Sequence, residues 1–265
     1  MSIFDRGLLY GDGIFETIRA YHGRLFRFDD HIRRLERSAR GIALRLPHHP
    51  RRYRRQLLDL LAANRLHDAL IRLTVTRGVG PAGLDPPRPA RPTVIIVARP
   101  FTSYPAALYR RGFRVVTAKI RRPPPTAAPP HAKHLNYMVN ILAKREATRR
   151  RADDALLLSS AGHLCEGTTS NLFFIRGKTL LTPSRATGLL EGITRRVILE
   201  LAHRLKIPVR QGEFTPRTLL AADEAFLANT SYEVMPVVRV DGRTIGSGRP
   251  GPLTQRLHRA FAGLR

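Results

Sequence analysis

The chain has 265 residues, 43% of them hydrophobic, and a formal net charge of +26 at pH 7. This length suits one large domain or two of ordinary size, and the composition argues against a disordered chain. No apolar run approaches the 18 or so residues of a membrane-spanning helix, and the N-terminal segment has no signal-peptide pattern. Cys165 is the single cysteine, which excludes an intramolecular disulfide and favours a reducing, cytoplasmic setting.

The positive charge comes almost entirely from arginine. Of 46 basic residues, five are lysine, at positions 119, 133, 144, 178 and 206, so 41 are arginine. These arginines are spread along the chain without a zinc-ligand spacing or an RNA-binding aromatic motif. We therefore expect no metal and no specific nucleic-acid partner, only weak adhesion at low salt. Arginine replaces lysine as a surface charge, but its guanidinium does not deprotonate near neutral pH and cannot form a Schiff base.

Patterns in the first hundred residues predict a small α/β domain. A strand is expected over 13–20, with 23–28 as its hairpin partner. A helix should follow from about Asp29, with Asp30 as its N-cap. A further helix over 51–65, strands over 70–77 and 92–99, and an irregular Gly- and Pro-rich loop over 78–91 complete the region. The core side of the second helix is expected to consist of Leu57, Leu58, Leu60 and Leu61.

The stretch RRPPPTAAPP, residues 121–130, has the composition of a linker between domains. It predicts an N-terminal domain over 1–118, a linker over 119–132 and a C-terminal domain over 133–265. The second domain should begin with a helix from about Leu135 to Arg150 and end with another helix. Between them we expect strands over 155–159, 171–175, 179–182, 224–228 and 235–241, and a helix that begins after Gly192.

Two lysines stand close together in HAKHLNYMVNILAKREA, residues 131–147. Lys144 lies within the expected helix, away from the direction of Met138, Ile141 and Leu142, and should be a surface or flanking residue. Lys133 lies at the junction before the helix, where side chains often point into clefts. By itself, however, a lone lysine is usually just a solvated charge.

Two other segments contain groups that suit an anionic or protonated ligand. In LLEGITRRVILELA, residues 189–202, Ile193 and Thr194 stand at a helix N-terminus, where free backbone N–H groups bind phosphate; an ordinary cap by Thr194 is the alternative. In HLCEGTTSNLFF, residues 163–174, Glu166 is expected in a turn between strands. It would either bind a protonated ring nitrogen or face solvent.

Seven sequence blocks follow one another along nearly the whole chain: DRGLLYGDGIFETIRAY, HIRRLERS, RLTVTRG, KHLNY, CEGTTSNLFF, LEGITR and EVMPV. In this order they resemble the class IV pyridoxal-phosphate enzymes. This family includes branched-chain aminotransferases, D-amino-acid aminotransferases and aminodeoxychorismate lyases. The resemblance implies an α+β, two-domain fold of type IV, with a smaller N-terminal α/β domain and a larger C-terminal domain built on a barrel-like sheet.

The resemblance also implies roles for individual residues and pyridoxal 5′-phosphate (PLP) as the cofactor. Lys133 matches the family's Schiff-base lysine and Glu166 the acid that binds the pyridine nitrogen. Tyr137 resembles the tyrosine on the ring oxygen, although it stands one residue closer to the lysine than usual. Residues matching the phosphate contacts are Arg34, Ile193, Thr194, Asn229 and Thr230. Residues expected to meet substrate are Phe15, Arg19 and Arg72, with Tyr10 as a further pocket wall.

Some positions depart from the family pattern. The usual strand and hairpin before the DRG block are missing, because DRG begins at residue 5; a late start or a truncation would each account for this. Glu191 replaces the proline of the usual LPGITR. Ala82 and Leu84 stand where D-amino-acid enzymes carry an arginine and a histidine, which makes a D-amino-acid specialist less expected.

The same lysine, acid and phosphate anchors serve transamination and lyase chemistry alike. We expect amino transfer between an apolar, branched-chain type L-amino acid and 2-oxoglutarate; the alternative is 4-amino-4-deoxychorismate lyase, which releases pyruvate and 4-aminobenzoate. The family's sites are completed by a loop from a second subunit. Apolar residues at 84, 101, 104 and 108 have no obvious cover within the chain, so a homodimer is expected.

Overall fold

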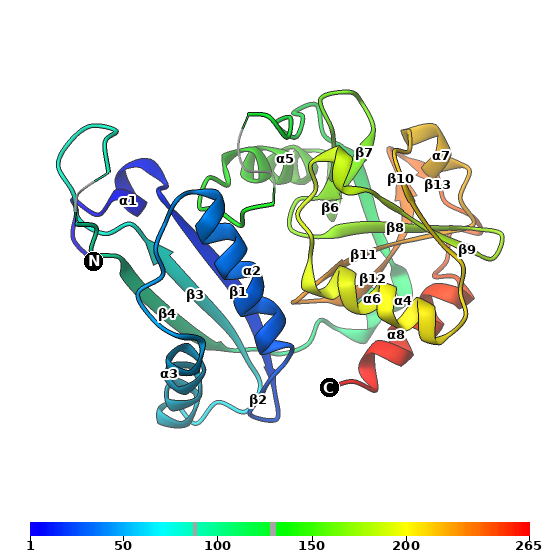
Figure 1. The fold of residues 1–265 in the computed structure, drawn as a ribbon. Helices are drawn as coiled ribbons and strands as arrows, with labels where there is room; N and C mark the ends of the chain where they lie inside the picture. The colour runs from blue at the N-terminus through cyan, green and yellow to red at the C-terminus, as the bar shows by residue number, and fades with distance from the viewer. Residues whose placement is uncertain (87–88, 128–130) are drawn as a thin grey trace. The chain divides into compact units, whose positions relative to one another are not determined.

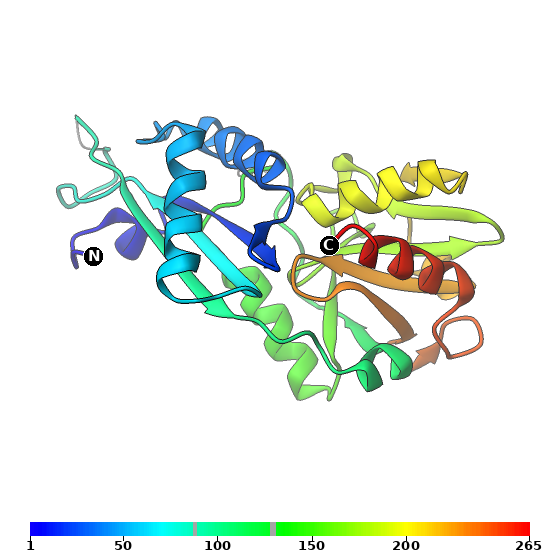
Figure 2. The same ribbon diagram turned by 90° about the horizontal axis from the view of Figure 1, so that it is seen from below.

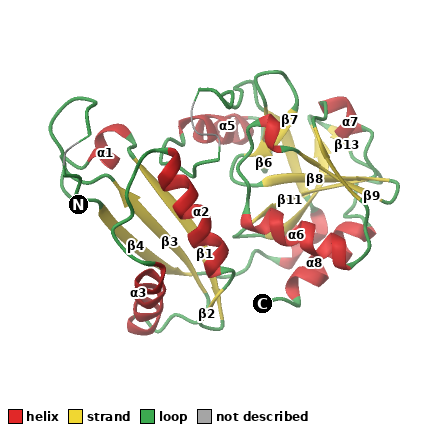
Figure 3. Cartoon of the chain, viewed as in Figure 1, coloured by secondary structure: helices red, strands yellow, loops and turns green. Residues whose placement is uncertain are grey.

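The computed structural model describes residues 1–86, 89–127 and 131–265. It divides into two compact units: unit 1 comprises Met1–Thr102 and His131–Tyr137, and unit 2 comprises Ser103–Pro130 and Met138–Arg265. Among the described residues, no helix has the length and apolar character needed to cross a bilayer. Figure 1 labels the elements of each unit and Figure 3 distinguishes its helices, strands and loops.

Unit 1 is a four-stranded antiparallel sheet in the order β2-β1-β3-β4. Helices α2 and α3 pack on one face of this sheet, as Figure 2 also shows. The core lies between them, because Ile14, Ile18, Ile71 and Leu73 point to this face and meet Leu35 and Leu57 of the helices. The elements are α1 (Arg6–Tyr10), β1 (Gly13–Tyr21), β2 (Arg24–Leu25), α2 (Phe28–Gly41), α3 (Pro50–Ala63), β3 (Ala69–Thr76) and β4 (Thr93–Pro100).

The core of unit 2 is a closed ring of six strands. β7, β8, β11, β12, β5 and β6 follow one another, and the pairing of β7 with β8 closes the ring. Apolar residues from all six strands form one interior cluster. The strands are β5 (Phe113–Thr117), β6 (Asp154–Leu158), β7 (Leu164–Gly167), β8 (Asn171–Arg176), β9 (Thr179–Pro183), β10 (Val209–Gly212), β11 (Glu224–Asn229), β12 (Glu233–Val240) and β13 (Arg243–Thr244).

Five α-helices are described in unit 2, together with one short 3₁₀ helix at Arg185–Thr187. Ala143 and Ala147 of α5 pack against Ala155 and Leu157 of β6. The helices are α4 (Ala106–Arg111), α5 (Met138–Arg149), α6 (Ile193–Arg204), α7 (Pro216–Leu220) and α8 (Pro252–Ala262).

Several expectations from the sequence need correction. Helix α2 begins at Phe28 with Arg27 at the N-cap position, and Asp30 instead pairs with Arg27. In α3 the buried residues are Tyr53, Leu57 and Leu61, whereas Leu58 is 40% exposed, because a narrower stripe of the helix meets the sheet.

The compact units also differ from the division at residues 118 and 133. Residues 103–118 belong with unit 2, because β5 pairs with β6 and β12. The segment before α5 belongs with unit 1. Residues 121–127 of the expected linker form no helix or strand, and 128–130 lie outside the described residues.

Candidate active site

The residues expected at the site are divided between the two units. Unit 1 contains Lys133, Tyr137, Arg34, Phe15, Arg19 and Arg72. Unit 2 contains Glu166, Ile193, Thr194, Asn229 and Thr230.

The main chain fixes the position of Lys133. Its carbonyl accepts a hydrogen bond from Phe15 N at 2.9 Å, and Leu135 N donates to Gly13 O at 3.0 Å. The Lys133 N–H donates to Ser38 Oγ of α2 at 3.0 Å. Residues 133–135 thus lie along the edge of β1, and these bonds fix the backbone from which the Lys133 side chain extends.

The Lys133 amine lies beside two aromatic side chains. Its Nζ donates to the Tyr137 hydroxyl at 3.1 Å and lies 4.6 Å from the centre of the Phe15 ring. Phe15 and Tyr137 contact each other edge to face, with ring centres 5.2 Å apart. All five lysines fall among the described residues, and Lys133 is the one that is not fully exposed.

A guanidinium covers the same phenyl ring. Arg72 Cζ lies 3.7 Å from the centre of the Phe15 ring. Thr17 pairs with Arg72 and Phe15 with Thr74, so these side chains share the face of the sheet opposite α2 and α3. Arg72 is an exposed residue, but partial desolvation lowers the pKa of its guanidinium, and the nearby Tyr137 partly offsets this. A cation, an apolar ring and an amine are therefore adjacent.

The opposite face of β1 carries a buried ion pair. Arg34 Nε donates to Glu16 Oε1 at 2.8 Å and its Nη2 to Glu16 Oε2 at 2.6 Å. Burial raises the pKa of Glu16, but Arg34 and a hydrogen bond from His31 outweigh it and lower that pKa to about 2. Burial lowers the pKa of His31, whose Nδ1 lies 2.8 Å from Glu16 Oε2. A charged carboxylate can only accept, so this nitrogen carries the proton.

Arg19 has structural contacts within unit 1. It is 3% exposed, its guanidinium lies 3.8 Å from the Phe101 ring centre and 4.8 Å from that of Tyr21, and it pairs with Asp68 at 3.7 Å. These contacts also give Phe101 a neighbour inside the chain. A structural function for Arg19 is therefore well supported by its surroundings.

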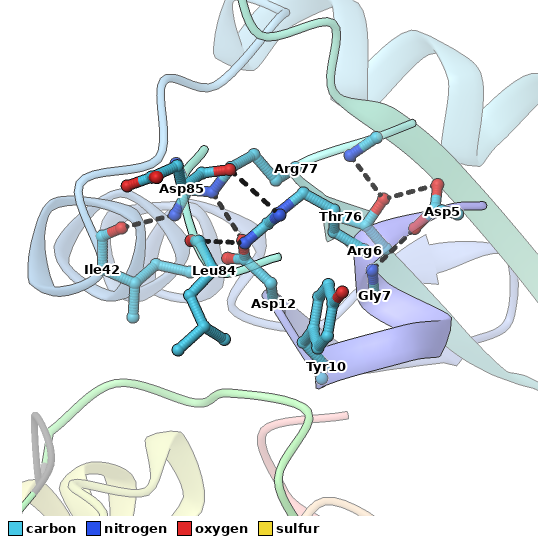
Figure 4. A network of polar contacts seen from close by, with 12 residues as sticks. Asp5, Arg6, Gly7, Tyr10, Asp12, Ile42, Thr76, Arg77, Leu84 and Asp85 are labelled. Atoms are coloured by element: carbon cyan, nitrogen blue, oxygen red, sulfur yellow. Dashed lines mark hydrogen bonds and ion pairs between the residues drawn. The ribbon is translucent and has the colours of Figure 1, made fainter. Parts of the chain in front are cut away.

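A second network joins α1 to the loop after β3, as Figure 4 shows. Arg6 donates to Gly83 O and Leu84 O, both at 2.9 Å, and to Asp12 Oδ2 at 3.0 Å. Arg77 donates to the same Asp12 oxygen at 2.7 Å. Burial raises the pKa of Asp12, but the two arginines outweigh it and lower that pKa overall. Tyr10 lies here too, because its hydroxyl accepts from Gly83 N.

Glu166 of unit 2 is a strand residue and is 6% exposed, so neither the turn nor the solvent-facing alternative is correct. Strand β7 continues to Gly167, so Glu166 lies within the strand and pairs with Leu157 of β6. Its Oε2 accepts from Leu190 N at 3.0 Å, and Arg122 Nε lies 3.2 Å from its Oε1. The acid is buried, and each of its oxygens has a polar neighbour.

Helix α6 begins with free donors. Its N-cap residue is Gly192, no side chain caps the helix, and Thr194 therefore does not serve as the cap. A Cβ at position 192 would lie 2.1 Å from Asn171 Oδ1, so glycine permits this close approach. In the turn after β11, the Asn229 side chain accepts from Ser231 N and Tyr232 N, both at 2.9 Å. Thr230 is half-buried in the same turn.

Sequence patterns missed Glu16, His31 and Arg122. Glu16 alternates with Ile14 and Ile18 on a strand, and a charge in such a pattern indicates a buried partner. His31 and Arg34 stand three residues apart on a helix, so they share a face. Arg122 offered no local signal, because it stands in a Pro-rich segment.

We predict that Glu16→Gln lowers the free energy of unfolding by about 3 kcal/mol at pH 7, because Arg34 would stay buried without its partner. The folded pKa of about 2 lies below the usual 4.5, so the charged pair stabilises the fold above pH 4.5 and this contribution is lost as pH falls toward 2. The difference in the free energy of unfolding between wild type and variant should therefore narrow by about 2 kcal/mol from pH 6 to pH 3.

Urea unfolding followed by circular dichroism measures both effects. Asp59→Asn removes the same charge from an exposed position of α3 and should change stability little. A gap that stays constant over this pH range would contradict the strong pairing of Glu16.

Known proteins share the sequence and the fold of this chain. The amino-transferase class IV family matches residues 13–240. A Methanocaldococcus jannaschii protein, provisionally named a branched-chain-amino-acid aminotransferase, is 40% identical over 265 residues, which cover 100% of this chain and 91% of that protein. The D-alanine aminotransferase of Bacillus licheniformis is 35% identical, covering 98% and 90% respectively.

The crystal structure of the Escherichia coli branched-chain aminotransferase matches the fold with a TM-score of 0.94. The two chains are 33% identical, and the match covers 100% of this chain and 89% of the other. The expected two-domain fold of type IV is thereby confirmed, including the closed strand ring of the larger part. The chain belongs to the class IV aminotransferases, a family of PLP-dependent enzymes.

Proposed function

We propose that this enzyme transfers an amino group between an apolar L-amino acid of the branched-chain type and 2-oxoglutarate, with PLP as cofactor. The observation that supports this best is the Phe15 ring, which contacts the Arg72 guanidinium at 3.7 Å and the Lys133 amine at 4.6 Å. An amino acid needs a cation for its carboxylate and, when its side chain is hydrocarbon, an apolar surface. Both stand beside the amine that would bind the cofactor.

The side chains present suit PLP. Lys133 offers an amine for its aldehyde carbon, with the Tyr137 hydroxyl 3.1 Å away. Glu166 offers a fixed carboxylate for the ring nitrogen, and the uncapped start of α6 at Ile193 and Thr194 offers N–H groups for the phosphate. We propose Arg34, Asn229 and Thr230 as further phosphate contacts, with Arg34 held in orientation by Glu16.

Bound PLP supplies an electron sink that makes the Cα–H bond of an attached amino acid acidic. Lys133, once its amine is free and neutral, would remove the proton from Cα and return it elsewhere. The main-chain bonds of Lys133 to Phe15 and Ser38 hold the base in place during both steps. The Tyr137 hydroxyl would orient the amine.

Arg72 is the substrate cation that its surroundings favour. It lies on the Phe15 face of the sheet and has an aromatic rather than an acidic neighbour. Arg19 is paired with Asp68 and stacked between two rings, so it would support the pocket rather than bind the carboxylate. A carboxylate at Arg72 would also stabilise a guanidinium whose pKa is lowered by partial desolvation.

The loop after β3 favours an L-amino acid. It presents Ala82 and Leu84 where D-amino-acid enzymes carry an arginine and a histidine, and Leu84 is 83% exposed. Arg6 holds the backbone of this loop through Gly83 and Leu84. At these two positions the loop therefore offers apolar surface rather than a cation for a substrate carboxylate.

We further propose a homodimer. Met138, Ile141 and Leu142 are 63%, 50% and 40% exposed, and all lie on α5. Such an apolar helix surface is costly in water and is typical of an interface. Two of the residues that led to this expectation from the sequence have neighbours within the chain. Leu108 packs against the interior cluster of unit 2, and Tyr104 packs against Tyr232.

Reduction of the PLP-loaded protein with borohydride, followed by peptide mapping, should place the pyridoxyl group on Lys133. Lys133→Ala should lose both label and turnover, because the covalent attachment and the base are removed together. Lys144→Ala is the matched control, since Lys144 is exposed on α5 and should leave labelling unchanged. A label on Lys144 would contradict the assignment.

Addition of L-leucine or L-valine should change the absorbance of the bound cofactor, and 2-oxoglutarate should restore it. Arg72→Ala should raise KM for both substrates by about 10- to 100-fold, because a charge-assisted pair is lost, and leave cofactor affinity unchanged. Arg99→Ala is the control, because exposed Arg99 lies on the neighbouring strand β4. If neither amino acid changes the spectrum while aminodeoxychorismate yields pyruvate, the enzyme is a lyase.

Sedimentation velocity should show a dimer for the wild-type protein and a monomer for Ile141→Glu, because a charge at an apolar interface is costly. Thr148→Glu adds the same charge at another exposed position of α5 and should remain dimeric. A monomeric wild type with full activity would overturn the proposal.

A further inference from the structure

A cavity of about 540 Å³ lies in unit 2, and none of its lining residues is proposed to bind the cofactor or substrate. It is bounded by Tyr109, Arg110 and Arg111 of α4, by Thr254 and His258 of α8, and by Arg249 in the segment before α8. Its volume falls in the range of small-molecule sites. The proposed amino-transfer chemistry gives it no function.

The charge around this cavity is positive and only partly compensated. Arg110 and Arg249 form no ion pair with any described residue, and none of the described residues that line the cavity is acidic. The neighbouring acids are already engaged: Asp153 pairs with Arg111 at 2.6 Å, and Glu233 pairs with Arg265 and lies 3.8 Å from His258. Two guanidinium groups in a concave site, each with free donors, suit an oxyanion.

Aromatic surface completes the cavity. Tyr109 and His258 are stacked, with ring centres 4.9 Å apart and planes 24° from parallel. The Tyr109 hydroxyl is fixed by donation to Tyr232 O at 3.1 Å. A rigid stacked pair beside two guanidinium groups offers contact to a planar organic body.

We propose that this cavity binds a small planar organic oxyanion, carboxylate or phosphate. Its anionic group meets Arg110 and Arg249, and its planar part lies against the Tyr109–His258 pair.

Calorimetric titration of the PLP-saturated protein at 150 mM salt tests this with four probes: benzoate, adenosine 5′-monophosphate, adenosine and inorganic phosphate. Benzoate or the monophosphate should bind at one site per chain, and the one that binds identifies the oxyanion. Adenosine lacks the charge and inorganic phosphate the planar body, so both should bind at least about tenfold more weakly. If neither planar anion binds, the proposal is wrong.

A chain of such positive charge attracts anions everywhere, so the variants must be matched in charge. Arg110→Gln with Arg249→Gln should weaken binding at least about tenfold. Arg51→Gln with Arg55→Gln removes two exposed charges from α3 and should change the affinity for the anion less than about twofold. Equal weakening by both pairs would mean adsorption without a site.

Discussion

The pairing of residues 133–135 with the edge of β1 is the constraint on which unit 1 depends. It joins segments more than 110 residues apart in the sequence and ties Lys133 to Phe15 through a main-chain bond of 2.9 Å. Backbone pairing of this kind fixes register, and register fixes which side chains are neighbours. The neighbours of the amine, Tyr137 and Phe15, follow directly from it.

Because side chains alternate along β1, neighbouring residues lie on opposite faces of the sheet and have different partners. Phe15 points to one face, where it meets Arg72 and the lysine amine. Glu16 points to the other, where it holds Arg34 and His31 under α2. A shift of one residue would place the carboxylate beside Lys133 and the phenyl ring in the charged cluster. The strict antiparallel register of β1 with β3 over eight residue pairs opposes such a shift.

Much of the fold could be predicted, because alternation and proline punctuation are local signals. The strands around Ile18, Ile71 and Phe173 lie where their patterns placed them. β7 was missed, since four residues around Glu166 carry too short an alternation. The apolar side of α5 does not face the core of its own unit. Met138, Ile141 and Leu142 are exposed, while Asn140, Ala143 and Ala147 are buried against the ring. Periodicity identifies an apolar face but not what covers it.

The same limit applies to the site. Motif resemblance pointed to Lys133, Glu166 and Arg34, but it carried no information on what holds them. Glu16, Arg122 and Ser38 are partners brought close by tertiary pairing, and no spacing in the sequence announces them.

The distribution of lysine follows from the same physical chemistry. Arginine serves as a surface charge wherever solvent surrounds it, and a chain with 41 arginines uses it nearly everywhere. A position that needs an amine able to lose its proton excludes arginine, because guanidinium stays charged. Lys119, Lys144, Lys178 and Lys206 are exposed and could be arginine at little cost. Lys133 is half-buried between Phe15 and Tyr137, and the Schiff-base function proposed for it requires an amine rather than a guanidinium.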